Sequence, residues 1–141
     1  MSRILVPLDG SPASDRAVKH AVTVADGRAG AEIHLLHVQP PLPPHDATAS
    51  PHLRSGAMLA SDDTSHVFGT ASRALEQAGI RYITHDVHGD AAQEIAFYAD
   101  THGCDVIVMG TRGLGSIRNL LMGSVAMKVL HLVKIPVTLV K

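Results

Sequence analysis

Short apolar runs rich in β-branched residues alternate along this chain with segments of helical periodicity. The predicted strands cover residues 3–8, 32–38, 80–88, 105–109 and 137–140. Helices are predicted after Ser11, from about residue 57 or later to Gln77, from Asp90 to His102, and after Gly123. Strands separated by helices pair in parallel through right-handed crossovers. The pattern therefore predicts an α/β fold, a three-layer sandwich with helices on both faces of a five-stranded parallel sheet.

Capping signals mark where two of these helices begin and where one ends. Ser11 followed by Pro12 supplies an N-cap and a first-turn proline. Asp90 and Gln93 have the spacing of a capping box, and Gly103 stands where that helix should end. These residues favour helices with defined ends behind the first and third strands.

Composition limits the function classes. The chain has 141 residues, 45% of them apolar and 18% charged, which is typical of one compact domain. A formal net charge of −1 gives no reason to expect a nucleic-acid or membrane partner. The single cysteine, Cys104, allows no internal disulfide and reads as a small core residue. With no export signal and no run of membrane-spanning length in this sequence, we expect a cytoplasmic protein containing a flexible, proline-rich loop at about 39–56.

Glycine and serine positions gather behind the fourth predicted strand. Gly110 and Gly113 follow that strand, and Gly123 with Ser124 stands where the last helix should begin. Glycines let the backbone approach a ligand closely. A helix start offers unpaired amides and the positive end of a dipole, which suit a phosphate. This pattern indicates a nucleotide site.

The order of the strands decides what faces these glycines. Five such strands commonly order as 3-2-1-4-5 or 2-1-3-4-5, and ligands of open α/β sheets favour the crevice where the order reverses. In the order 3-2-1-4-5 the first and fourth strands are neighbours. Asp9, Val38 and Gly110 would then meet at the carboxyl edge of the sheet. We predict this order.

Several features have alternative interpretations. Asp9 is equally typical of a carboxylate flanking a helix start, and Gly113 could be a simple turn glycine. Arg112 and Arg118 are more typical of solvated side chains than of phosphate ligands. His34 and His37 fall on opposite faces of their strand, as do His85 and His88, and no spacing typical of zinc ligands occurs, so no metal site is predicted.

Several catalytic motifs are absent from the sequence. The chain has no Gly-x-x-x-x-Gly-Lys-Ser/Thr motif and no Gly-x-Ser-x-Gly elbow. The stretch 113–118 lacks the third glycine of a dinucleotide fingerprint. Phosphoryl transfer needs a residue that positions the attacking group, and only Asp9 is a candidate. We therefore predict binding without efficient turnover and assign no catalytic residue.

Four motifs carry a resemblance that covers essentially the whole chain. They are the runs 4–11, 89–90, 105–113 and 136–141. The chain resembles the universal stress protein family (UspA-like), whose fold is adenine nucleotide alpha hydrolase-like. The family's nucleotide signature is a glycine, two residues, a glycine, nine residues, and then Gly-Ser. Here it is complete from Gly110 to Ser124, which implies the ATP-binding branch.

The resemblance also implies roles for individual residues. Asp9 would lie by the ribose or adenine, Val38 would meet adenine through its backbone, and Pro7 would lie near the base. Met109 and Gly110 would line the sugar. The phosphates, with Mg²⁺ bound, would be held by four residues: Gly113, Gly123, Ser124 and Val125. Family members also dimerise, often by pairing the last strand, here 137–140, with its symmetry mate.

The implied role is nucleotide-dependent sensing or signalling in the stress response. Two alternatives stay open at this point. One is a slow ATPase or an adenylate-handling enzyme, by analogy of fold. The other is an interaction module that works without a nucleotide, or one that prefers AMP or cyclic AMP.

Overall fold

The computed structural model describes residues 2–41, 61–111 and 123–141, with the side chains of 61–65 excepted. Along the chain the elements are β1 (Arg3–Leu8), α1 (Pro12–Asp26), β2 (Glu32–Gln39), α4 (Ser61–Gln77), β3 (Arg81–His88), α5 (Ala91–Thr101), β4 (Val106–Gly110), α6 (Ser124–Leu132) and β5 (Val137–Val140). Each predicted strand and helix is present, and where an end differs from the prediction it differs by one residue.

The five strands form one parallel sheet in the order β3-β2-β1-β4-β5. The predicted order 3-2-1-4-5 is therefore confirmed. Strand β1 pairs with β2 on one side and with β4 on the other. Strands β2 and β3 therefore lie on one side of β1, and β4 and β5 lie on its other side.

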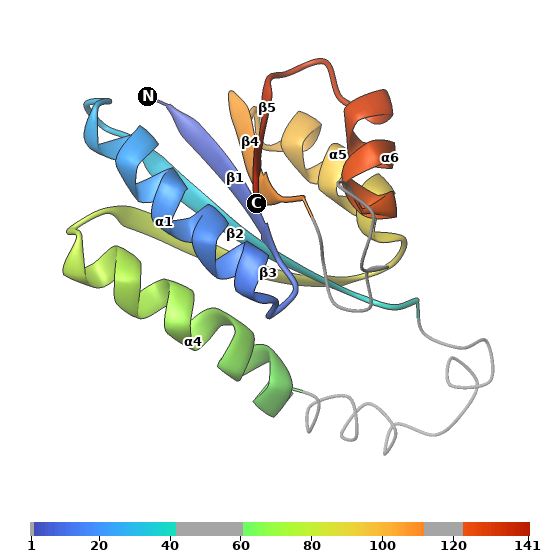
Figure 1. Cartoon of the computed structure of the whole chain (residues 1–141), viewed down its shortest axis with the longest axis horizontal. Helices are drawn as coiled ribbons and strands as arrows, with labels where there is room; N and C mark the ends of the chain where they lie inside the picture. Colours follow the sequence, from blue (N-terminus) through green and yellow to red (C-terminus); the bar gives the residue numbers. More distant parts are fainter. Residues whose placement is uncertain (1, 42–60, 112–122) are drawn as a thin grey trace.

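Helices cover both faces of this sheet, α1 and α4 on one and α5 and α6 on the other (Figure 1). The alternation of side chains along β1 supplies both cores. Ile4, Val6 and Leu8 pack with α1 and α4, whereas Leu5 packs with α5 and α6. Because a parallel sheet is apolar on both faces, β1 and β4 read as continuous apolar runs in the sequence.

Local capping agrees with the sequence signals. The Ser11 side chain accepts a hydrogen bond from the Ser14 amide at 3.2 Å, and Pro12 occupies the first turn of α1. Asp90 accepts from the Gln93 amide at 3.1 Å at the start of α5. These bonds fix the helix starts at the carboxyl edge of the sheet.

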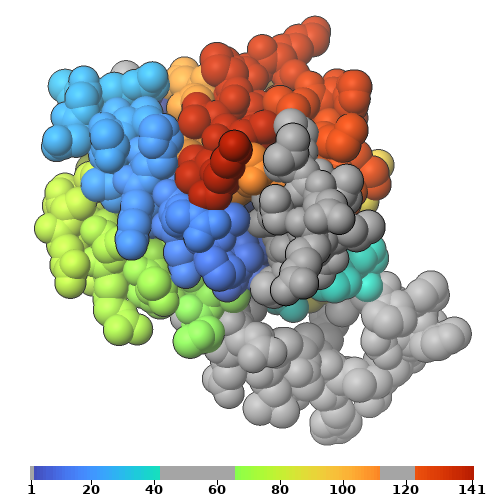
Figure 2. Space-filling view, in the orientation of Figure 1, coloured from blue at the N-terminus to red at the C-terminus, as the bar shows by residue number. Residues whose placement is uncertain are grey.

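The C-terminal end of the chain lies against α1, as Figure 2 shows. The guanidinium of Arg16 donates a hydrogen bond to the backbone oxygen of Lys141. Val140 at the end of β5 packs into the α1 side of the core. Helix α1 therefore spans β1, β4 and the last strand.

Close packing of α1 on β4 requires a glycine at position 110. A Cβ added to Gly110 would lie 2.7 Å from the Cβ of Ala13 and 3.0 Å from its carbonyl carbon. Both atoms belong to well-packed core, so neither can move far. Position 110 is thus constrained by packing, independently of any ligand.

We expect Gly110→Ala to lower the free energy of unfolding by about 1–3 kcal/mol, the usual cost of overpacking. Urea denaturation without nucleotide measures this. The matched control is Gly27→Ala, since a Cβ on Gly27 meets nothing within 4 Å. That control should leave stability unchanged or raise it by less than about 1 kcal/mol. Equal stabilities of the two variants would contradict the packing argument.

Candidate functional site

The carboxyl ends of three neighbouring strands carry the predicted site residues to one edge of the sheet. Leu8 pairs with His37 in β2, so Asp9 and Val38 follow side by side. Strand β4, which ends at Gly110, is β1's other neighbour. The structure thus brings the segments of Asp9, Val38 and Gly110 together where the strand order reverses.

Asp9 shapes the turn between β1 and α1. Its Oδ1 accepts a hydrogen bond from the Ser11 amide at 2.9 Å, and its side chain is half-buried. Gly10 lies between them and has a φ of +81°, a backbone conformation that residues other than glycine rarely adopt. The carboxylate therefore has a structural role at the helix start, in line with the alternative interpretation of this residue.

The start of α6 is tied directly to the end of β4. The Gly123 amide donates to the carbonyl oxygen of Thr111 at 2.5 Å, and the Thr111 amide donates to Val140 at 2.9 Å. Residues far apart in the glycine pattern, Gly110 and Gly123, therefore stand at adjoining ends of β4 and α6. The hydrogen bond between Gly123 and Thr111 could not be predicted from the sequence, because no side-chain pattern marks a bond between two backbone groups.

Gly123 is the N-cap of α6 and provides no side-chain cap. Its backbone is extended, with φ −73° and ψ 163°. Ser124 and Val125 follow in the first turn and are exposed. First-turn amides have no partner inside their helix, and the dipole there favours an anion. The chemistry offered at this position suits a phosphate oxygen.

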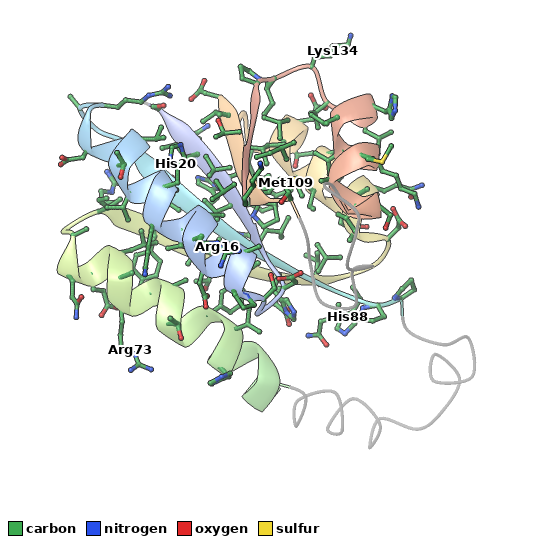
Figure 3. All side chains as sticks on the ribbon, in the orientation of Figure 1. Arg16, His20, Arg73, His88, Met109 and Lys134 are labelled. Atoms are coloured by element: carbon green, nitrogen blue, oxygen red, sulfur yellow. The ribbon has the colours of Figure 1, made fainter. Side chains whose placement is uncertain are left out.

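Pro7, Val38 and Met109 are the predicted neighbours of the base and sugar. Met109 is 5% exposed and points into the core beneath α5 and α6 (Figure 3). Val38 packs against the same core, and Pro7 is half-buried in β1. Because the Met109 side chain is used in packing, a ligand would meet this residue through its backbone.

Part of the predicted site lies outside the described residues. This holds for Gly113, for Arg112 and Arg118, and for most of the proline-rich stretch 39–56. The stretch also begins later than predicted, because Gln39 is the last residue of β2.

A polar group beside the site was missed by sequence reasoning. Asp86 bonds His37 Nδ1 at 3.0 Å and accepts from the Gln39 amide group at 2.6 Å. The His37 ring also meets Phe68 of α4 edge-on, with centroids 6.2 Å apart. His37 and Asp86 are register partners of β2 and β3, so only knowledge of the register could have paired them.

Three further observations concern metal binding, the cysteine thiol and the length of the helices. Within residues 2–41, 61–111 and 123–141, no group of three or more histidine, cysteine or acidic side chains is arranged to hold a metal ion. Burial raises the pKa of the Cys104 thiol to about 11, which keeps it protonated. Cys104 is a core residue, as predicted. None of the helices in the described part of the chain is long and apolar enough to span a membrane.

The geometry defines a class of protein: an open, parallel α/β sandwich whose candidate site, at the reversal of strand order, combines a strand that ends in a glycine with a helix start. The model of the universal stress protein family matches residues 1–141. The chain belongs to the universal stress protein family.

Individual relatives agree with this assignment. The chain is 30% identical over 139 residues to Universal stress protein MJ0531 of Methanocaldococcus jannaschii, covering 99% of this chain and 81% of that protein. Among solved structures, hypothetical protein MJ0577 is 26% identical with a TM-score of 0.86, covering 99% of this chain and 95% of that one.

Two more distant solved structures share the fold and contain nucleotides. One is a universal stress protein in complex with cAMP, 24% identical with a TM-score of 0.71, covering 99% and 96% of the two chains. The other, from Arabidopsis thaliana, has AMP bound and is 20% identical with a TM-score of 0.72, covering 100% and 92%.

The uncapped start of α6 leads to a stability prediction. We expect Gly123→Asp to raise the free energy of unfolding by about 0.5–1 kcal/mol, because its carboxylate caps first-turn amides and complements the helix dipole. The extended backbone at this position accepts any residue. Gly123→Ala, which adds a methyl group but no cap, is the control and should not gain stability. Equal stability of the aspartate and alanine variants would contradict the capping argument.

Proposed function

We propose that this protein binds ATP at the carboxyl edge of β1 and β4, and that nucleotide occupancy serves sensing or signalling in the stress response. The observation that carries the proposal is the start of α6, which has no side-chain cap. A hydrogen bond from the Gly123 amide to the Thr111 carbonyl holds it at the end of β4. It joins the two halves of the complete glycine signature. The oxygens of a phosphate bound there would accept hydrogen bonds from the first-turn amides of α6.

Each site residue has a role in this proposal. Asp9 lies by the ribose or adenine, Val38 meets the base through its backbone, and Pro7 lies beside it. The sugar rests against Met109 and Gly110. The phosphates are held by Gly113, Gly123, Ser124 and Val125. Mg²⁺ would be bound mainly by the phosphates and water, which is its usual manner in nucleotide sites.

Two kinds of observation support an adenine nucleotide as the ligand: the ligands of related structures and the glycine signature of this chain. Members of the same fold contain cAMP in one case and AMP in another, which favours an adenine nucleotide. The Gly-Ser end of the signature adds a place for phosphates beyond the first, which favours ATP. The absence of a P-loop lysine from the sequence favours binding over efficient hydrolysis. We propose a cytoplasmic, non-enzymatic protein of a single domain spanning 1–141.

Gly123→Asp separates nucleotide binding from folding. It places a carboxylate where the phosphates would lie, so we expect the affinity for MgATP to fall at least about tenfold, roughly 1.4 kcal/mol. Affinity for adenosine, which lacks phosphates, should change little. Isothermal titration calorimetry with both ligands measures the two effects, and the stability prediction above reports on the fold of the same variant.

The matched control is Gln77→Glu, which adds the same charge at the far end of α4. It should leave the affinity for MgATP unchanged. No binding by the unmodified protein at millimolar MgATP would refute the proposed ligand. Equal affinity of Gly123→Asp and the unmodified protein would refute the proposed position of the phosphates.

We further propose a homodimer formed through β5, the edge strand next to β4. Pro136 and Val140 direct their carbonyl groups toward β4. By the alternation of a parallel ladder, residues 137 and 139 direct their backbone groups to the open edge. The unpaired backbone groups of an apolar edge strand are usually covered by another element. In a two-fold symmetric dimer, the same strand of the partner pairs with them.

Thr138→Lys tests this dimer. A lysine on an edge strand opposes pairing with its symmetry mate, so the dimer dissociation constant should rise by about tenfold or more. Sedimentation velocity over a concentration series measures it. Thr70→Lys, an exposed change on α4, should leave the association unaltered. A monomeric unmodified protein at micromolar concentration, or equal association of both variants, would argue against the β5 interface.

A further inference from the structure

One carboxylate of β3 bonds two side chains at the end of β2. Asp86 Oδ1 lies 3.0 Å from His37 Nδ1, and Asp86 Oδ2 accepts a hydrogen bond from the Gln39 side-chain amide at 2.6 Å. These two partners are the residues on either side of Val38, the proposed neighbour of the base. We call Asp86, His37 and Gln39 the Asp86 clamp.

The partners define the chemistry of the clamp. An ionised carboxylate can only accept, so His37 Nδ1 carries a proton and donates it to Asp86. Hydrogen bonds to a charged acceptor are stronger than those between neutral groups. The side chains of His37 and Asp86 are 15% and 30% exposed, so water reaches only part of this pair. Phe68 of α4 packs edge-on against the His37 ring at 6.2 Å and holds it from another side.

The clamp acts where the backbone ladder of β2 stops. The Gly89 amide donates to the Gln39 carbonyl at 2.9 Å. Pro40 and Pro41 follow Gln39, and proline has no backbone N–H to donate to a sheet. A strand end that has few backbone partners opens easily. Side-chain bonds from Asp86 therefore supply support that the backbone cannot give.

The backbone of Val38 is directed toward β1. The Glu32 amide donates to the Ser2 carbonyl just before β1 at 2.9 Å, whereas Gln39 bonds on the β3 side. Because backbone groups alternate between the two neighbours along a strand, Val38 faces the same way as Glu32. The paired part of β1 ends at Leu8, the partner of the residue before Val38. The Val38 carbonyl is therefore directed into the crevice beyond the end of β1.

We propose that Asp86 is a positioning residue for the base: through His37 and Gln39 it holds the Val38 carbonyl in the direction that accepts the 6-amino group of adenine. This inference rests on the proposed nucleotide function. The 6-amino group of adenine is a donor, whereas the 6-oxo group of guanine is an acceptor and forms no hydrogen bond with a carbonyl. A site that reads such a group discriminates strongly against an analogue without it. The Asp86 clamp therefore contributes to selectivity for adenine over guanine.

Asp86→Ala in the full chain tests this role. The affinity for MgATP should fall by about three- to tenfold, the equivalent of one net hydrogen bond. The affinity for MgGTP, which makes no bond to the Val38 carbonyl, should change by less than about twofold. Isothermal titration calorimetry with both nucleotides measures the ratio of the two dissociation constants. General damage to the fold would weaken both ligands equally, so an unchanged ratio would overturn the proposal.

Asp86→Asn is the conservative variant. Its amide oxygen accepts from His37, and its amide nitrogen donates to the Gln39 side chain once that amide turns over. We expect it to keep the affinity and the selectivity of the unmodified protein. Asp100→Ala, an exposed change on α5, removes the same charge outside the clamp and should bind both nucleotides normally. An asparagine variant as weak as Asp86→Ala would refute the clamp, because the charge alone would then explain the effect.

The tautomer of His37 provides a measurement that needs no variant to fold. Nitrogen NMR of the ring in the unmodified protein, under mildly alkaline conditions, should find the proton on Nδ1. A neutral ring with its proton on Nε2 would overturn the clamp.

The results separate this inference from the proposed function. If the unmodified protein binds MgATP and Asp86→Ala has the same selectivity, the positioning role is refuted and the nucleotide site stands. If the unmodified protein does not bind MgATP, both are refuted.

Discussion

The pairing of β1 with β2 on one side and β4 on the other is the constraint on which the rest of the structure depends. Ile4, Leu5 and Val6 are fully buried, and they supply side chains to both cores. A strand that is apolar on both faces is stable only with a helix layer on each side. The return of the chain to β1 through β4 places the strand ends of the candidate site together.

At the start of α6, helix stability favours a capping side chain, whereas ligand binding favours free backbone amides. A side chain that caps a helix stabilises it, yet Gly123 leaves the first-turn amides without such a cap. An uncapped start costs stability in the free protein and leaves donors for a ligand. Gly110, in contrast, meets a packing demand from Ala13. The two glycines of one motif therefore have different physical causes.

Much of the fold could be predicted from the sequence, because strand runs, helical stripes and Ser11-Pro12 are local signals. Opposite faces for His34 and His37 were also predictable from their spacing, and their rings contact α5 and α4 respectively. The partners themselves were not predictable, since Tyr98 lies 64 residues from His34. The same limit applies to the Thr111–Gly123 bond and to Ala13 against Gly110. The roles assigned to Asp9, Val38 and Ser124 at a nucleotide stay predictions.

The hydrogen bond between Gly123 and Thr111 also bears on how such a protein can diversify. Thr111 and Gly123, the described residues on either side of positions 112–122, are joined by one hydrogen bond, and Thr111 is itself anchored to β5. The sheet and α6 therefore keep their register whatever length of chain joins these anchors. A change of sequence or length between these two anchors therefore leaves the strand pairing and the start of α6 in place.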